Sequence, residues 1–324
     1  MELRDVIAIG ASTGGVDALQ QVCAGLPGDL AAAVLVVLHR PADGPNLLGE
    51  ILERQCRMPV GVAADGEQVE PGRVYVAASD RHLMVVEGFI RLGRGPRENL
   101  TRPAIDPLFR SVAVSYGPRA IGVVLTGELN DGAAGLRDIK RCGGVTVVQG
   151  PADAEAPSMP ANALQTSDVD YRAPLARIAE VMAHLVGEPA GPRPTVPRAI
   201  ELEVDIALGR PCGSATIMEF ADPAPLSCPA CSGVLSQVRD GRPLRYRCQV
   251  GHAYTAQALD AVQKTDVDEA LRVALRIIEE RAVLSETLAA EALSAGQEHS
   301  GRSFKNRAQE MRGYAETLRR AAIS

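Results

Sequence analysis

The feature that most constrains the fold is a short apolar run that ends at a serine among glycines. Residues 6–9 read VIAI, and the sequence GASTGG follows at residues 10–15. A run of this length, partly β-branched, is typical of a strand buried on both faces of a parallel sheet. Residues 16–22 then show a helical pattern. Ser12 is therefore predicted to lie in a tight strand-to-helix turn that leaves its hydroxyl accessible.

Three interpretations of this turn remain open at this point. The glycines can hold a phosphate at a helix N-terminus, although their spacing fits neither G-x-G-x-x-G nor the P-loop and no lysine follows. Alternatively, Ser12 is a nucleophile, and backbone N–H groups near Thr13 hold an oxyanion. The turn can also be purely structural. The nucleophile interpretation requires a base and an orienting acid elsewhere in the chain.

Two further predicted strands end at residues that can supply this chemistry. Residues 31–38 are apolar and are followed by His39, and residues 120–125 lead into the segment that contains Asp131. The alternation of strands and helices predicts an α/β fold, with a doubly wound and mostly parallel sheet in a three-layer sandwich. Ligand sites in such sheets form at the carboxyl ends of the strands. We therefore expect Ser12, His39 and Asp131 to meet there as nucleophile, base and orienting acid.

Two local predictions concern the segments between these strands. Residues 58–92 contain several short apolar runs joined by turns, and we expect them to form an antiparallel insertion. Asp106 precedes Pro107 and a helical pattern over residues 108–116. This arrangement predicts that Asp106 caps the N-terminus of that helix, with Pro107 at its first position.

Length, charge and cysteine content restrict the class of protein. The 324 residues include 34 Lys and Arg against 40 Asp and Glu, for a net charge of −6. This length predicts two domains or one domain with an extension, and the charge gives no reason to expect nucleic acid or membrane binding. No signal-like segment opens the sequence and no apolar run reaches membrane-spanning length, so we expect a cytoplasmic protein. The odd number of cysteines, seven, argues against a complete disulfide framework.

The ordered motifs of the first half resemble the catalytic domain of CheB, the chemotaxis protein-glutamate methylesterase. The resemblance covers about residues 5–187, and the motifs that carry it lie at residues 10–15, 37–39, 65–67, 72–77, 102–106 and 131–133. It implies hydrolysis of glutamyl γ-methyl esters on chemoreceptor helices with release of methanol, and glutamine deamidation as a second activity in some members. It also implies that Ser12, His39 and Asp131 are the catalytic residues, with Thr13 and Glu128 on the oxyanion and substrate side.

Several positions depart from the pattern of that family. Glu128 and Leu129 replace a usual methionine and glycine, Ala64 replaces a commonly acidic residue, and Ser158 replaces the glycine of a Gly-Met-Pro motif. A carboxylate beside the oxyanion site can repel developing negative charge or alter which ester fits. Glu128 thus motivates an alternative function, a catalytically weak signalling adaptor that binds a receptor-like helix. A receiver domain before the first catalytic strand is not expected, so neither is control by phosphorylation within this chain.

The second half is predicted to contain a linker and two further modules. Residues 188–200 are rich in proline and mark the end of a catalytic domain at residues 1–187. Within residues 201–260, Cys228, Cys231, Cys248 and His252 have C-x2-C and C-x3-H spacing. This spacing predicts a zinc-ribbon-like module with a tetrahedral structural zinc site, and the open alternative is a metal-free hairpin with buried cysteines. No cofactor is expected for catalysis.

Residues 261–324 are predicted to form a helical hairpin. A helical apolar pattern extends over residues 266–294, residues 296–301 interrupt it, and a second helical pattern follows. Such a hairpin can pack on itself or on the zinc-ribbon-like module. It can also provide a surface for a homodimer or a signalling partner.

Overall fold

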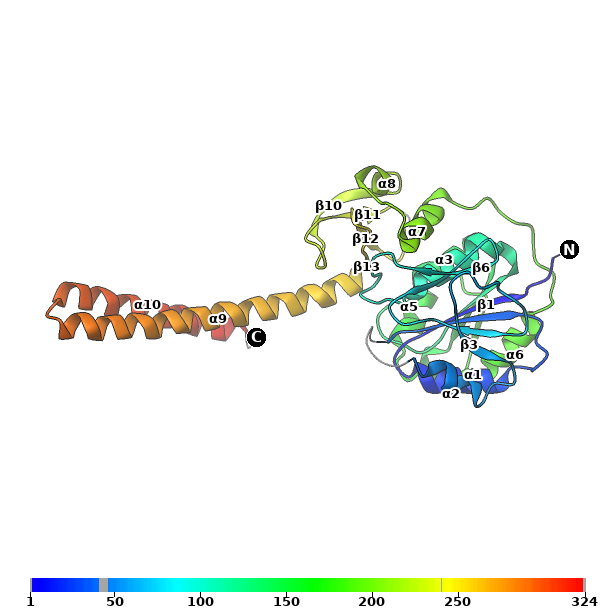
Figure 1. Cartoon of the computed structure of the whole chain (residues 1–324), viewed down its shortest axis with the longest axis horizontal. Helices are drawn as coiled ribbons and strands as arrows, with labels where there is room; N and C mark the ends of the chain where they lie inside the picture. Colours follow the sequence, from blue (N-terminus) through cyan, green and yellow to red (C-terminus); the bar gives the residue numbers. More distant parts are fainter. Residues whose placement is uncertain (1, 41–45, 240, 323–324) are drawn as a thin grey trace. The chain divides into compact units, whose positions relative to one another are not determined.

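The computed structural model describes residues 2–40, 46–239 and 241–322 (Figure 1). The chain divides into two compact units, residues 1–259 and 260–324. The first unit contains the Ser12 segment, the proline-rich linker and the cysteine-containing segment. The cysteine-containing segment therefore packs with residues 1–187 as one unit. No described helix combines the length and the apolar character that crossing a membrane requires.

The first unit is built on a seven-stranded sheet in which every pair of neighbours is parallel. Its strand order is β3-β4-β2-β1-β7-β8-β9. The strands are β1 (Val6–Ala11), β2 (Ala33–Leu38), β3 (Val60–Val62), β4 (Val74–Val76), β7 (Ala120–Val124), β8 (Val145–Gln149) and β9 (Tyr171–Ala173). Along β1, Ile7 and Ile9 enter one apolar core while Val6 and Ala8 enter the other. The predicted strand buried on both faces is thereby confirmed.

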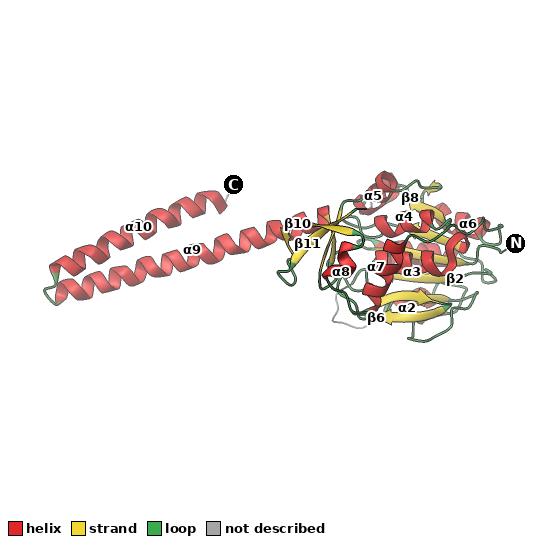
Figure 2. Ribbon diagram, turned by 90° about the horizontal axis from the view of Figure 1, so that it is seen from above, coloured by secondary structure: helices red, strands yellow, loops and turns green. Residues whose placement is uncertain are grey.

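Helices cover both faces of this sheet, as the three-layer prediction requires (Figures 1 and 2). One face carries α1 (Gly15–Gly25), α2 (Leu48–Glu53) and α6 (Leu175–Leu185), whose apolar residues share a core with the sheet. The other face carries α3 (Ile105–Tyr116), α4 (Ala133–Arg141) and α5 (Ser158–Thr166). Short 3-10 turns occur at Gly117–Arg119 and Pro151–Asp153.

The predicted antiparallel insertion is wrong for half of its length. Strands β3 and β4 are parallel members of the main sheet, and only β5 (His82–Val86) and β6 (Phe89–Gly93) form an antiparallel hairpin. The prediction paired strands that are neighbours in sequence, which is the commoner arrangement. However, β4 is buried along its whole length, so it gains more by lying beside β2 within the sheet.

The predicted capping role of Asp106 is also wrong. Helix α3 begins at Ile105, and its N-cap residue Ala104 makes no side-chain capping bond. Asp106 lies within the first turn and is 1% exposed. Its Oδ1 accepts a hydrogen bond of 2.7 Å from the backbone N–H of Gly135 on α4. A contact between two helices has therefore taken the carboxylate that the local pattern assigned to a cap.

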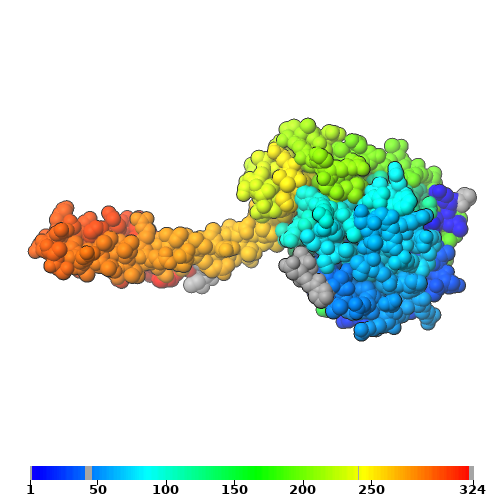
Figure 3. Space-filling model, viewed as in Figure 1, coloured from blue at the N-terminus to red at the C-terminus, as the bar shows by residue number. Residues whose placement is uncertain are grey.

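The remainder of the first unit follows the linker. It comprises α7 (Arg198–Leu208), α8 (Ser214–Met218) and a four-stranded antiparallel sheet, and α7 packs against α3 (Figure 2). The strands of this sheet are β10 (Ala221–Ser227), β11 (Val234–Val238), β12 (Arg245–Cys248) and β13 (Ala253–Thr255), in that order. We refer to residues 221–259 as the cysteine–histidine module, which appears in yellow-green to yellow in Figure 3.

The second unit is the predicted helical hairpin, formed by most of α9 (Ala256–Ser294) and by α10 (Glu298–Ala322). Ion pairs join its two helices between Glu286 and Arg312 and between Glu279 and Arg319. The interruption is shorter than the predicted residues 296–301, because α10 already includes Gly301. Gly296, in the left-handed region at φ 76°, lies in the connecting turn.

Candidate active site

Ser12 lies directly after β1, in the tight turn that its glycines predicted. Gly14 has φ 71°, a left-handed conformation that costs glycine little. A Cβ atom on Gly15 would come within 2.5 Å of Leu38 Cδ1, so the close approach of α1 to β2 also requires a glycine. The backbone N–H of Ser12 donates to the carbonyl of Thr126 at 3.0 Å. These contacts hold Ser12 at the carboxyl edge of the sheet.

The predicted nucleophile, base and acid come together at this edge. Neighbouring strands β2, β1 and β7 lead into His39, Ser12 and Asp131, respectively, so the strand order brings the three residues to one edge of the sheet. The side-chain contacts then place the imidazole between the hydroxyl and the carboxylate. His39 Nδ1 lies 3.2 Å from Ser12 Oγ, and His39 Nε2 lies 2.7 Å from Asp131 Oδ2. Each side chain comes from the strand end that the sequence indicated.

Asp131 is held by four hydrogen-bond donors although it is only 2% exposed. Oδ2 accepts from His39 Nε2 and from the Ile105 N–H at 2.6 Å, while Oδ1 accepts from Asn99 Nδ2 at 2.9 Å and from the Asp106 N–H at 3.3 Å. Burial alone would raise the pKa of Asp131, but the bond and charge of His39 and the other donors lower this pKa to about 2.

The ionised state of Asp131 decides which imidazole nitrogen carries the proton. An aspartate carboxylate can only accept, so Nε2 of neutral His39 must be the protonated nitrogen that donates to it. Nδ1 is then free to accept the hydroxyl proton of Ser12. The arrangement is therefore competent for general-base activation of the serine.

Two backbone N–H groups beside Ser12 are available to a ligand. Among the described residues, the amide groups of Thr13 and Glu128 have no hydrogen-bond acceptor. Thr126 shapes this region, because its hydroxyl donates to the Thr13 carbonyl at 3.0 Å and accepts from the Ala156 N–H at 2.8 Å. These are the two residues for which the family resemblance predicts an oxyanion role.

The departures at Glu128 and Ser158 contact each other. The single hydroxyl proton of Ser158 is shared between two acceptors, Glu128 Oε2 at 3.3 Å and the Leu129 carbonyl at 3.2 Å. Leu129 has φ 60°, in the left-handed region that suits the glycine of the family pattern. The loop thus has the conformation of a glycine-containing loop, and Ser158 holds the Glu128 carboxylate from one side.

A carboxylate also opposes the phosphate-binding interpretation of the glycine turn. A Cβ atom on Gly14 would lie 2.6 Å from Glu155 Oε2, so a negative charge already lies against the turn. An anion at this position would be repelled. With Ser12, His39 and Asp131 in contact, the nucleophile interpretation has the stronger support.

Two of the residues that support Asp131, Asn99 and Thr255, carried no recognised signal in the sequence, and a third, Asp106, was assigned to a helix cap. Asn99 and Asp106 come from the loop before α3 and from its first turn, and Thr255 ends β13 in the cysteine–histidine module. Thr255 donates its backbone N–H to Asn99 Oδ1 at 2.9 Å. Burial, together with the charge of Asp131, raises the pKa of Asp106 to about 8.

Cys228, Cys231, Cys248 and His252 form a second cluster, in which one ligand atom from each lies within 4.8 Å of all the others. The Sγ atoms of Cys231 and Cys248 are 3.6 Å apart, and Cys248 Sγ lies 3.5 Å from His252 Nδ1. A tetrahedral zinc ion with Zn–S bonds of about 2.3 Å places two sulfurs about 3.8 Å apart. The donor set and its spacing therefore fit zinc.

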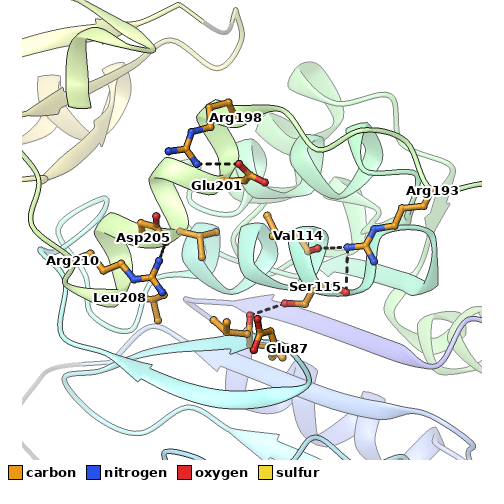
Figure 4. Close-up of a pocket in the computed structure, with 12 residues that line it drawn as sticks. Glu87, Val114, Ser115, Arg193, Arg198, Glu201, Asp205, Leu208 and Arg210 are labelled. Atoms are coloured by element: carbon orange, nitrogen blue, oxygen red, sulfur yellow. Dashed lines mark hydrogen bonds and ion pairs between the residues drawn. The ribbon is translucent and has the colours of Figure 1, made fainter. Parts of the chain in front are cut away.

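A separate cavity of about 430 Å³ lies between α7, α3 and the β5–β6 hairpin (Figure 4). Its arginines are already paired, Arg198 with Glu201 at 3.2 Å and Arg210 with Asp205 at 2.6 Å. Arg193 donates to the Val114 carbonyl. None of the residues that line this cavity belongs to the Ser12 site, and we assign it no ligand.

Comparison with known proteins gives one matching family. Residues 7–182 match the family model described as CheB methylesterase. The chain is also similar to the crystal structure of the Thermotoga maritima CheB methylesterase catalytic domain, with a TM-score of 0.54 and 31% identity. That similarity covers 57% of this chain and all of the other.

Curated relatives share the same segment. A protein-glutamate methylesterase/protein-glutamine glutaminase of Yersinia pestis is 40% identical over 181 residues, which are 55% of this chain and 52% of that protein. A second such protein from Methanosarcina acetivorans is 37% identical over 192 residues, 57% and 54% of the two chains. A putative enzyme of this name from Leptospira interrogans is 37% identical over 182 residues, which are 56% of this chain and 94% of that protein. The matched segment spans only about half the length of the first two relatives.

Proposed function

The chain belongs to the CheB methylesterase family, and we propose that it hydrolyses glutamyl γ-methyl esters on the cytoplasmic helices of chemoreceptors. The observation that carries this proposal is the contact of Ser12 with His39 and of His39 with Asp131 at one edge of the sheet. The names of the relatives support the substrate class. We accordingly propose that the protein acts in the cytoplasm.

The geometry supports a two-step mechanism. Ser12 Oγ attacks the ester carbonyl carbon while His39 Nδ1 takes the hydroxyl proton. The amide groups of Thr13 and Glu128 stabilise the oxyanion of the tetrahedral intermediate. The intermediate collapses, and His39 returns the proton to the departing methoxide, which leaves as methanol. Water then attacks the acyl-serine while His39 takes one of its protons, and His39 returns this proton to Ser12 Oγ as the acyl bond breaks and the glutamate carboxylate leaves. Asp131 stabilises the imidazolium in both steps.

The same residues support glutamine deamidation as a second activity. A glutamine side chain presents a carbonyl of the same shape to Ser12, and His39 would protonate the leaving NH2 group, which departs as ammonia, in place of methoxide. The relatives from Yersinia and Methanosarcina carry both activities in their names. An amide is a poorer acylating group than an ester, so we expect the deamidation rate to be the lower of the two.

The adaptor alternative that Glu128 motivated is not favoured. An adaptor without catalysis has no need for an aspartate held by four donors behind a histidine in contact with a serine. The contact of Ser158 with Glu128 also shows that this carboxylate has a partner on the protein. Glu128 therefore bears on the rate and on the choice of ester.

We also propose that Cys228, Cys231, Cys248 and His252 bind one structural zinc ion. Two tight turns carry the ligands: the Ser232 N–H donates to the Cys228 carbonyl at 2.7 Å, and the Gly251 N–H donates to the Cys248 carbonyl at 2.9 Å. Four protein ligands leave no open coordination position, which is the pattern of structural zinc. Metal analysis of the purified chain should give one zinc per molecule, and a stoichiometry that Cys231→Ser leaves at one would contradict the site.

The helical hairpin is proposed to contact another protein, either a second copy of the chain or a signalling partner. It exposes apolar side chains, among them Ile277 at 45%, Val283 at 62% and Leu284 at 59%. Such residues seldom cluster on a surface that contacts only water. Sedimentation velocity of the full chain distinguishes a dimer from a monomer that awaits a partner.

Methanol release from methylated receptor domains tests the esterase proposal. We compare the wild-type chain with Ser12→Ala and label both with a fluorophosphonate probe. Release and labelling should occur with wild type and be lost in the variant. Absence of both from a folded, metal-loaded wild-type protein would contradict the proposal.

A further inference from the structure

We propose that the cysteine–histidine module positions the catalytic aspartate, so that the metal bound at its cysteines controls the reactivity of Ser12. This inference rests on the esterase and zinc functions proposed above. It identifies Asn99 and Thr255 as positioning residues, which act on the reaction through Asp131. The contacts that carry it lie within the first unit of the structure.

Asn99 connects the module to the active site through its side-chain amide. Its Nδ2 donates to Asp131 Oδ1 at 2.9 Å and lies 3.3 Å from Asp106 Oδ2, while its Oδ1 accepts from the Thr255 N–H at 2.9 Å. Its own N–H donates to the Ala253 carbonyl at 2.8 Å. Asn99 has φ 47° and is 7% exposed. Strand β13 thus supplies two of the contacts that hold Asn99 in an unusual conformation beneath the carboxylate.

Thr255 makes a second connection on the other side of Asp131. Its hydroxyl donates to Asn130 Oδ1 at 2.5 Å and accepts from the Ala258 N–H at 3.3 Å, which caps the N-terminus of α9. Asn130 directly precedes Asp131 and is 4% exposed. Thr255 therefore contacts both Asn99, which donates to Asp131, and Asn130, the residue that precedes Asp131 in the chain.

A buried ion-pair network anchors the module to the esterase half. Arg247, which is 0% exposed, donates to Glu98 Oε1 and to Glu203 Oε1, both at 2.9 Å. Glu98 is the residue before Asn99, and it also pairs with Arg110 of α3 at 2.9 Å. Removing one partner from such a network leaves a buried charge without compensation, which is strongly destabilising. The module therefore cannot detach without disturbing the loop that holds Asn99.

The cysteine cluster lies at the centre of these contacts along the chain. Arg247 immediately precedes Cys248, and its Nη1 donates to the carbonyl of Gly251 at 2.8 Å, inside the turn between Cys248 and His252. Ala253, the acceptor for Asn99, immediately follows His252. Metal ligation fixes this turn, because so small a sheet buries little apolar surface of its own. Loss of the metal would release Arg247, Ala253 and Thr255 together.

The test follows zinc content and Ser12 reactivity in the same samples of the full chain. Zinc is removed with a chelator and restored with zinc chloride, its content is measured by atomic emission, and the rate of Ser12 labelling by a fluorophosphonate is recorded. We expect labelling to fall about 10- to 100-fold with zinc loss and to recover on restoration. Cys231→Ser should reproduce the loss, whereas Cys212→Ser, which changes a cysteine outside the cluster, should not.

Two further changes keep the test decisive if metal-free protein unfolds. Asn99→Gly suits the left-handed conformation and removes only the side-chain amide, so it should lower kcat for a p-nitrophenyl ester about 10- to 100-fold at constant KM and zinc content. Thr255→Val should also lower kcat, and Thr255→Ser should restore it because the hydroxyl is kept.

The outcomes separate this inference from the proposals on which it rests. Zinc-loaded wild-type protein without Ser12-dependent labelling would overturn the esterase function and this inference together. Unchanged labelling after complete zinc loss, or unchanged kcat in both Asn99→Gly and Thr255→Val, would overturn the inference alone. Parallel loss of zinc and labelling, with reduced kcat in both variants, establishes it.

Discussion

Replacing Asp131 by asparagine tests the proposed role of the carboxylate most directly. The two oxygens of Asp131 each accept two N–H donors, one pair from His39 and Ile105 and the other from Asn99 and Asp106. An asparagine has one NH2 group in place of an oxygen. Either orientation of the amide therefore turns that NH2 group toward two donors.

Both orientations impair catalysis. If the NH2 group faces His39, the imidazole must accept at Nε2 and carry its proton on Nδ1, where it can no longer take the proton of Ser12. If the NH2 group faces Asn99, the Asn99 amide and the Asp106 N–H lose their acceptor, which costs about 1–3 kcal/mol for each buried donor. The imidazolium that forms during catalysis also loses its negatively charged partner. We expect kcat to fall about 10⁴-fold, or about 5.5 kcal/mol in activation free energy.

The assay is ester hydrolysis with separate determination of kcat and KM. KM should change little, because Asp131 lies buried behind His39 and is only 2% exposed. Asp170→Asn is the matched control, since Asp170 accepts from the Thr146 N–H and hydroxyl, both at 2.9 Å, on another part of the sheet. A kcat for Asp131→Asn within tenfold of wild type, with the control also unchanged, would refute the role of Asp131.

Three further predictions concern stability and the shape of the site. Burial and Asp131 raise the pKa of Asp106 from its ordinary 3.8 to about 8, so the folded chain binds this proton more tightly than the unfolded chain. The contribution of Asp106 to the free energy of unfolding is therefore fully present below about pH 4 and is lost as pH rises toward 8. Relative to wild type, the free energy of unfolding of Asp106→Asn should rise by up to ~5 kcal/mol between pH 4 and 8, at about 1.4 kcal/mol per tenfold change in proton affinity. Urea unfolding of both proteins at several pH values should show this rise. Gly127→Ala would bring a methyl group within 2.8 Å of Ser12 Cβ and 2.7 Å of Met159 Cε, so fluorophosphonate labelling should slow at least tenfold, and equal rates would refute the close packing. Leu129→Gly should raise stability by about 1 kcal/mol, because Leu129 has φ 60°, and an unchanged thermal midpoint would contradict that strain.

The meeting of Ser12, His39 and Asp131 at one edge could be predicted because each follows a buried parallel strand. Apolar runs that end in Ser12 and His39 identify strand ends without knowledge of the strand order, and the carboxyl ends of parallel strands share one edge. The prediction of which strands pair was less successful. It depended on sequence neighbours, whereas β4 pairs with β2 at the register Val34 to Val74.

The residues that hold Asp131 could not be found in the same way. Asn99 lies in an irregular loop without periodicity, and its partner Thr255 is 156 positions further along the chain. The carboxylate of Asp106 was assigned to a helix cap because that signal is local, but a backbone amide of α4 binds it instead. Contacts of this kind depend on how separate segments pack, which a single sequence does not encode as a pattern.

The contact between Asn99 and Thr255 has a consequence for how the protein is made. The ribosome synthesises β1, β2 and β7, with the residues that follow them, before β12 and β13 exist. The central sheet can form at that stage, but Glu98 then lacks Arg247, and Asn99 lacks both of its partners on β13. Asp131 acquires its full set of supporting contacts only after translation has passed residue 255. Newly made chains therefore complete the Ser12 site late, once the segment that contains the cysteines has been synthesised and has folded against it.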